Sequence, residues 1–253
     1  MKIFSRLFLL LLLAGTTFYA CMDDDDSLGP NETTELRIDF RGEFNGEPLA
    51  IQRETYAYAD SQDVNLQLFQ YYVSDLALIP AGGGPDVPLS EILLVRYNSA
   101  LDDELDTRTF TVPGGAYSGL RLGLGVSPDL NAIDPNNFSA NDPLNENEFW
   151  NANARYVFAK IEANTDLDAD GTLESNLTLH MGADTLYRTI TLNQPFTLDG
   201  NGDPTLTVVA DVFSTLQGYD IADPAQQRVH GGNQSAAFGV WDRLADGLRL
   251  VVR

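Results

Sequence analysis

The sequence predicts an all-β fold, an antiparallel β-sandwich with long loops in a single domain. Three observations predict it: segments in which apolar and polar residues alternate, turn-forming residues between these segments, and scarce helical periodicity. Alternation with period two places one face of a strand in the core and the other in solvent. Many short strands of this kind favour a sandwich over an alternating α/β fold.

The alternating segments follow one another along most of the chain, and each is bounded by Gly, Pro, Asn or Asp. The expected strands lie within residues 36–40, 66–69, 108–112, 120–124, 156–162, 177–180 and 205–210. In residues 156–162, period two places the odd-numbered and even-numbered side chains on opposite faces, so Lys160 and Glu162 share a face.

Helical signals are few. Residues 213–218 indicate a short helical turn, and residues 140–153 have the polar, Asn-rich composition of a long functional loop. No second domain or internal repeat is indicated. The roughly 220 residues that follow the N-terminal segments are enough for one β-rich domain with a substantial core.

The N-terminus resembles a bacterial lipoprotein signal. Lys2 and Arg6 precede an apolar run at residues 7–14, which is too short for an ordinary membrane-spanning helix and suits a signal peptide. Ala20 stands directly before Cys21, the only cysteine. Residues 1–20 are therefore expected to be the signal peptide, with Cys21 lipidated as the mature N-terminus. The alternative is an ordinary secretory signal cut nearby, which would leave a free thiol.

Four consecutive aspartates at residues 23–26 follow this cysteine. Residues 21–34 are expected to form an acidic disordered tether, and residues 35–253 the folded domain. An acidic run beside a lipid anchor also resembles the export signal of surface lipoproteins, which predicts the outer face of the outer membrane. The formal charge is -22 and becomes -24 without Lys2 and Arg6, so nucleic acid is a poor partner.

The candidate metal ligands are a tryptophan and the two histidines of the chain. Trp150 lies in an aromatic segment, residues 149–163 (FWNANARYVFAKIEA), and His180 follows downstream in the run LHMG. His230 lies in a glycine-rich loop. Copper accepts imidazole nitrogen readily. The alternatives are hydrogen-bonded or surface histidines and a tryptophan that only packs.

The same segment resembles the MbnP-like family, the methanobactin-associated and copper-repressible surface proteins, whose members carry a pattern close to MxWxWxxGYxFxKxEG. Residues 71–78 (YYVSDLAL) are similar to the family's FYLSNIxL strand. Residues 113–126 (PGGAYSGLRLGLGV) are similar to its PxGxYxxLxFxLGV block, and SPDLN at 127–131 continues it. The blocks occur in the family's order between about residues 36 and 238.

The resemblance implies a copper site. In members of the family a tryptophan of this region is oxidised to kynurenine and supplies a ligand beside two histidines. Trp150 aligns with the first tryptophan of the pattern, and His180 matches the histidine of an LHxG-like strand. The sequence departs from the pattern at Ala152, where the family has a second tryptophan or a histidine, and at Arg155, where it usually has glycine. No motif places His230.

The function implied is that of an outer-membrane surface lipoprotein that binds copper or another transition metal for acquisition or storage. The resemblance also implies a dihaem peroxidase-like partner able to oxidise a tryptophan, and an outer-membrane transporter. The alternative is a surface ligand-binding or interaction module of the same fold that has lost the copper site and holds structural calcium.

A second candidate metal site is an acidic loop. Asp166, Asp168 and Asp170 stand at alternate positions before a glycine, which is the front half of an EF-hand-type calcium loop. Its twelfth position is Leu177 instead of the bidentate glutamate, and strands flank it. Calcium in a hairpin loop, held by these aspartates with Glu174, is therefore the prediction, and a plain acidic turn is the alternative.

No catalytic motif is present, so the protein is not expected to be an enzyme. The sequence has no Gly-x-Ser-x-Gly elbow, and Cys21 is expected to carry lipid. With 37 acidic residues, pairs of carboxylates do not indicate a glycosidase.

Overall fold

The computed structural model describes residues 32–59, 61–101, 104–145, 148–168 and 170–253. The expected signal peptide, Cys21 and nearly all of the expected tether lie outside these residues. Strand β1 begins at Thr33, slightly before the expected start of the domain. No helix in the described part of the chain is long and apolar enough to cross a membrane.

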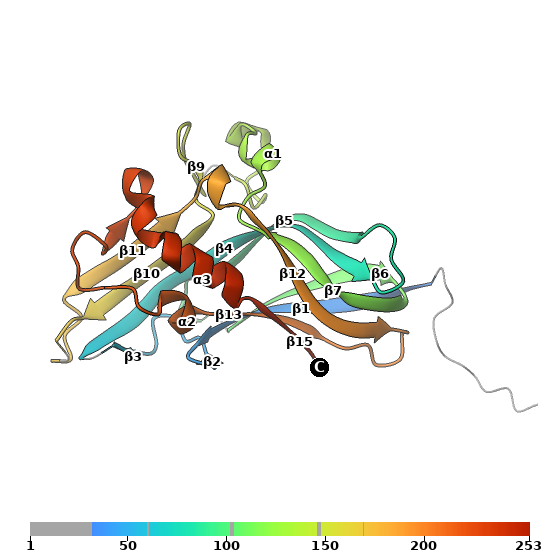
Figure 1. Cartoon of the computed structure of the whole chain (residues 1–253), viewed down its shortest axis with the longest axis horizontal. Helices are drawn as coiled ribbons and strands as arrows, with labels where there is room; N and C mark the ends of the chain where they lie inside the picture. The colour runs from blue at the N-terminus through green and yellow to red at the C-terminus, as the bar shows by residue number, and fades with distance from the viewer. Residues whose placement is uncertain (1–31, 60, 102–103, 146–147, 169) are drawn as a thin grey trace, which may run out of the picture.

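The described residues form two main β-sheets and a small hairpin (Figure 1). The five-stranded sheet has the order β15 (Arg249–Val252), β13 (Leu206–Asp211), β1 (Thr33–Phe44) and β2 (Glu47–Pro48), with β6 (Leu105–Pro113) also paired to β1. The eight-stranded sheet has the order β12 (Arg188–Leu198), β7 (Gly115–Leu124), β4 (Gln62–Pro80), β10 (Ala159–Asp166), β11 (Ser175–Met181) and β14 (Arg228–Val229), with β3 (Tyr56–Ala59) and β5 (Val87–Tyr97) also paired to β4. The hairpin is formed by β8 (Phe149–Asn151) and β9 (Arg155–Tyr156).

The all-β prediction is confirmed. Each alternating segment of the sequence lies mainly in a strand, and most pairs of neighbouring strands are antiparallel. Two pairs are parallel, β1 with β13 and β11 with β14. The second of these pairs positions part of the candidate site.

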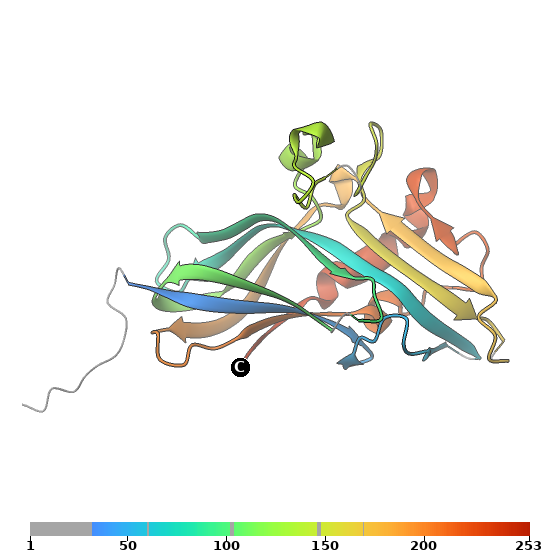
Figure 2. The ribbon, with the colours of Figure 1, turned by 180° about the vertical axis from the view of Figure 1, so that it is seen from behind.

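Strand β4 has 19 residues, and its two halves pair with different neighbouring strands of the larger sheet. Along one edge, residues 63–71 pair with β10 and residues 73–80 pair with β7. One end of the sheet therefore consists of β10, β11 and β14, and Figure 2 shows β10 and β11 side by side next to β4. This end carries the candidate site.

The core follows from alternation within the strands. Leu36, Ile38 and Phe40 of β1 are fully buried, and Ile38 and Phe40 pair with Leu206 and Val208 of β13. Full burial of each such side chain stabilises the fold by about 1.5–3 kcal/mol.

Short helical segments lie in the connections between the described strands. They include α1 (Pro128–Asn131), η1 (Pro135–Asn137), η3 (Asp184–Leu186) and α2 (Val212–Leu216). The last one matches the short helical turn expected at residues 213–218.

The sequence pattern did not predict helix α3 (Phe238–Gly247) or the 3-10 segment η4 (Gly231–Ala237) that leads into it. The buried residues of α3 are Val240, Trp241, Leu244 and Ala245, a helical stripe. The indole of Trp241 donates a 2.7 Å hydrogen bond to the Leu186 carbonyl and packs 6.2 Å from the ring of Phe158. Helix α3 therefore anchors η4, which begins directly after His230.

The strand expected at residues 156–162 is interrupted in the structure. Tyr156 ends β9, and β10 starts at Ala159. Val157 and Phe158 between them are both buried, because Phe158 packs on Trp241, so the predicted alternation of faces is wrong there. It is right for Lys160 and Glu162, which are partly exposed while their neighbours in β10 are buried.

Candidate metal site

A row of polar residues crosses one end of the larger sheet. Arg96 of β5 pairs with Gln70 of β4, Gln70 pairs with Lys160 of β10, and Lys160 pairs with His180 of β11. Residues directly opposite each other on neighbouring strands point to the same face. The strand register therefore places these four side chains side by side on one face of the sheet.

Parallel pairing extends the row to His230. Strand β14 pairs with β11 through Arg228 opposite Thr178 and Val229 opposite Leu179. His180 follows Leu179 in β11, His230 follows Val229 directly after the end of β14, and the ring centroids of the two histidines lie 6.1 Å apart. Two histidines that are distant in the sequence are thus brought together by a strand of two residues.

Trp150 contacts both histidines from the β8–β9 hairpin. Its ring centroid lies 5.7 Å from that of His180 and 5.2 Å from that of His230, with interplanar angles of 74° and 31°. The side chain is 43% exposed. The three residues predicted as a metal site from the sequence therefore form one cluster, which is open to solvent at Trp150 and at the exposed His230.

Glu148 fastens the segment before Trp150 to the polar row. Its Oε2 accepts hydrogen bonds from Lys160 Nζ at 2.7 Å and from Gln70 Nε2 at 3.0 Å, and its Oε1 pairs with Arg96. Arg96 Nε also donates to Gln70 Oε1 at 2.8 Å. Because Glu148 lies two residues before Trp150, this partly buried ion-pair network limits where the indole can lie.

The carboxylate of Glu148 is stabilised in its ionised form. Burial alone would raise its pKa, but the hydrogen bonds from Lys160 and Gln70 and the attraction of Lys160 and Arg96 outweigh burial and lower the pKa of Glu148. At neutral pH this side chain therefore carries a negative charge that Lys160 and Arg96 neutralise.

His180 has a second carboxylate beside it. Its Nε2 lies 2.7 Å from Oε1 of Glu162, which is the diagonal neighbour of His180 on β10 because Glu162 pairs directly with Thr178. This hydrogen bond is the main cause of the lowered pKa of Glu162. The other ring nitrogen, Nδ1, is buried and has no hydrogen-bond partner among the described residues.

These residues fit a transition-metal ion. Because a metal–imidazole bond is about 2.0 Å long, two rings on one ion have centres about 5–6 Å apart. The observed 6.1 Å between His180 and His230 is close to that range. A buried nitrogen without a partner is also a ligand atom that an ion would satisfy, and imidazole suits copper and zinc better than calcium or magnesium.

The hairpin explains the two departures from the family pattern. Ala152 is exposed in the turn between β8 and β9, where it supplies no ligand. Arg155 has a φ of 59°, a left-handed conformation that glycine adopts without strain and other residues adopt at a cost of about 1 kcal/mol. Its Nη1 donates to the carbonyls of Asn131 at 3.2 Å and Ala132 at 3.0 Å, and these bonds offset the cost.

Asn131 holds the other strand of the hairpin. Its side chain is buried, accepts a hydrogen bond from the Tyr156 backbone at 3.2 Å and donates to Asp184 at 2.7 Å. The SPDLN block that contains Asn131 is recognisable in the sequence, but no role for this side chain was predicted from it. Glu148, Gln70 and Arg96 were also not predicted. The only sequence signal for this group is the position of Glu148 directly before the aromatic segment.

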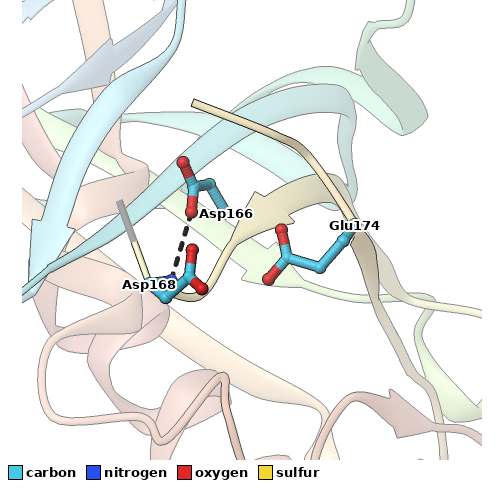
Figure 3. Close-up of side chains that lie close together, drawn as sticks. All are labelled: Asp166, Asp168 and Glu174. Carbon is cyan, nitrogen blue, oxygen red and sulfur yellow. Dashed lines mark hydrogen bonds between the residues drawn. The ribbon is translucent and has the colours of Figure 1, made fainter. Parts of the chain in front are cut away.

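The acidic loop brings together three of its four predicted calcium ligands. Oxygen atoms of Asp166, Asp168 and Glu174 lie within 4.8 Å of one another (Figure 3). Asp170 is outside this group, and its carboxylate accepts a 2.7 Å hydrogen bond from the backbone of Thr172. The other three carboxylates also accept hydrogen bonds from backbone N–H groups. The backbones of Gly171 and Asp168 donate to Asp166. Those of Asp170 and Leu167 donate to Asp168 and Glu174, respectively.

Fold and site together define a β-sandwich protein with a tryptophan and two histidines gathered at one end of its larger sheet. The family model described as MbnP matches residues 33–232, which include all three of these residues. The chain belongs to the MbnP family, and the resemblance in the sequence blocks is confirmed.

One solved structure that is similar to the chain is MbnP from Methylosinus trichosporium. The two are 19% identical, with a TM-score of 0.49, and the match covers 73% of this chain and 78% of that one. The search of curated proteins found no match.

Replacing Glu148 by Gln is expected to lower the free energy of unfolding by about 1–3 kcal/mol at neutral pH, because Lys160 and Arg96 lose their counter-charge. The pKa of Glu148 is lowered in the folded state, so its stabilisation is complete above the ordinary glutamate pKa and disappears as the pH falls through the lowered value. The difference between wild type and Glu148→Gln should therefore shrink in acid.

Chemical denaturation over a series of pH values measures this difference. The matched control is Glu47→Gln, a substitution at an exposed glutamate of β2, which should change stability little at any pH. A Glu148→Gln deficit that stays constant from neutral to acid pH would contradict the assigned charge network.

Proposed function

We propose that this protein binds a copper ion between His180 and His230 and holds it for acquisition or storage at the outer-membrane surface. The observation that carries the proposal is the buried Nδ1 of His180, which has no hydrogen-bond partner among the described residues. A second imidazole lies 6.1 Å from that of His180, and the Trp150 ring lies 5.7 Å and 5.2 Å from the two. Membership of the MbnP family supports copper in particular.

The donor set favours a soft or borderline ion. Two imidazoles supply nitrogen ligands, and Cu²⁺ binds such sites more tightly than the other common divalent first-row metals. Trp150 is exposed on one side, so an ion bound below it would keep access to solvent. The chemistry fits binding and release of an ion, and we propose a binding protein instead of an enzyme.

The N-terminal residues support the location proposed. A signal peptide over residues 1–20 and lipid on Cys21 would anchor the chain, and the acidic tether would hold the domain away from the membrane. The proposed partners are a dihaem peroxidase-like protein that oxidises the tryptophan and an outer-membrane transporter that receives the ion. Both partners are proposed from the family resemblance.

Copper binding is tested by titration of the metal-free protein. Wild type is expected to bind about one copper ion per chain through two imidazole ligands. His180→Ala and His230→Ala should each weaken this binding by at least about tenfold, because each removes a ligand. Competition with a chelator of known affinity gives the dissociation constants.

The control is Asp168→Asn, which removes a carboxylate from the acidic loop and leaves both histidines in place. It should bind copper as wild type does. Copper binding that survives both histidine substitutions, or that depends on Asp168, would contradict the proposed site.

Oxidation of Trp150 is a separate prediction. We propose that the exposed indole becomes kynurenine when the protein is produced in cells that also contain the peroxidase-like partner, while Trp241, which is fully buried, stays unmodified. Peptide mass spectrometry across both tryptophans measures this. An unmodified Trp150 under those conditions would contradict this prediction.

A second candidate function is a surface interaction module with structural calcium. The grouping of Asp166, Asp168 and Glu174 within 4.8 Å favours it, since hard carboxylate oxygens suit Ca²⁺. Ala152, which supplies no ligand where the family pattern has a tryptophan or histidine, also favours it.

Calcium added to chelator-treated protein should then raise the melting temperature, because a ligand at a hundredfold excess over its Kd stabilises the native state by about 2.7 kcal/mol. Asp166→Asn should remove this shift, whereas Glu162→Gln, at a glutamate outside the loop, should preserve it. Equal melting temperatures with calcium and with chelator would eliminate the calcium site.

A further inference from the structure

We infer that Glu162 is the positioning residue of the histidine site: it holds His180 in the Nε2–H tautomer and so leaves Nδ1 as the nitrogen that takes the metal. The inference rests on the proposed function. It adds which atom of His180 binds the ion and which neighbouring side chain determines this.

The hydrogen bond between the two side chains fixes one proton. Glu162 Oε1 lies 2.7 Å from His180 Nε2. An ionised carboxylate has lone pairs and no proton, so it only accepts hydrogen bonds. The donor must therefore be His180, and its Nε2 carries a hydrogen.

Burial determines the state of the other nitrogen. His180 Nδ1 is shielded from solvent and has no hydrogen-bond partner among the described residues. A hydrogen on Nδ1 would be a buried donor without an acceptor, which is more costly than an unfilled lone pair available to an incoming ion. Neutral imidazole has one donor and one acceptor nitrogen, so Nδ1 is the acceptor.

Glu162 is the carboxylate available for this role because Glu148 is already occupied. Glu148 accepts from Lys160 and Gln70 and pairs with Arg96. Glu162 also attracts Lys160 electrostatically, but its side chain is hydrogen-bonded to His180. The two glutamates therefore have different roles, since Glu148 fastens the Trp150 segment and Glu162 orients the imidazole.

This arrangement has the form of a carboxylate–histidine–metal relay, in which a second residue fixes the tautomer and ring orientation of a ligand. Strand pairing makes it rigid, because Glu162 and His180 lie on adjacent strands of one antiparallel ladder. Loss of such a partner typically weakens metal affinity by about tenfold to a hundredfold.

Long-range ¹H–¹⁵N NMR of the metal-free, ¹⁵N-histidine-labelled protein tests the tautomer directly. The protein has only two histidines, so His230→Gln assigns the His180 signals. Wild type is expected to show His180 protonated at Nε2. Glu162→Ala should mix the two tautomers, and Glu162→Gln should keep the Nε2–H form, since its amide oxygen still accepts the hydrogen bond.

Copper affinity of the same proteins completes the test. Glu162→Ala should bind copper about tenfold to a hundredfold more weakly than wild type, and Glu162→Gln should retain most of the affinity. The exposed Glu47→Gln substitution on β2 serves as the neutral control.

The outcomes separate the two proposals. A His180 protonated at Nδ1, or a tautomer that Glu162→Ala leaves unchanged, would overturn the inference while copper binding by wild type still supports the site. Stoichiometric binding with unchanged affinity in Glu162→Ala would do the same. The expected tautomer in a wild-type protein that binds no copper would overturn the proposed function, and the ligand role of Nδ1 with it.

Discussion

The pairing of β10 with β4 on one side and β11 on the other is the interaction on which the rest of the structure depends. It places Gln70, Lys160 and His180 in one row and, by the same register, places Ala159 and Ile161 in the core. A slip of one residue would exchange these two faces, so the polar side chains would enter the core and the apolar ones would face solvent. Burial of the apolar side chains, which stabilises this strand register, therefore also fixes the positions of the polar side chains of the site.

The charges around Glu148 then determine how the aromatic segment covers this row of polar side chains. A buried carboxylate is stable only when opposite charges and hydrogen bonds compensate its lost hydration. Glu148 meets this condition through Arg96, Lys160 and Gln70, and it brings the adjacent aromatic segment down onto the sheet. The indole of Trp150 consequently rests against both histidines, so ion pairing on one half of the row positions the aromatic ring on the other half.

The predictability of this site differs from residue to residue. Trp150 and His180 follow from motifs because each lies in a segment that matches a block of the family pattern. The position of His230 depends on a parallel pairing of only two residues in β14, and no local pattern records such a contact. The partners of Glu148 are likewise separated from it in the chain by up to 78 residues, so only the folded sheet shows the network.

The strands and helices also differ in how well the sequence predicted them. Alternation predicted parts of β1, β4, β6, β7, β10, β11 and β13, but it did not predict the long strands β5 and β12, and β12 contains a register shift between Asn193 and Phe196 in its pairing with β7. Helix α3 escaped prediction because Gly239 and Gly247 lower its helix propensity and Phe238 at its start is exposed, so its apolar stripe is short. Packing of Trp241 against Phe158, a tertiary contact, supplies the stability that local propensity lacks.

The central claim is that one metal ion lies between the two imidazoles beneath the indole. Anomalous diffraction at the copper absorption edge, from crystals of the protein grown with copper, tests it most directly. We expect one strong peak within bonding distance of His180 Nδ1 and a nitrogen of His230. A strongest peak at Asp166 and Asp168, or no peak near the histidines at full copper loading, would contradict the claim.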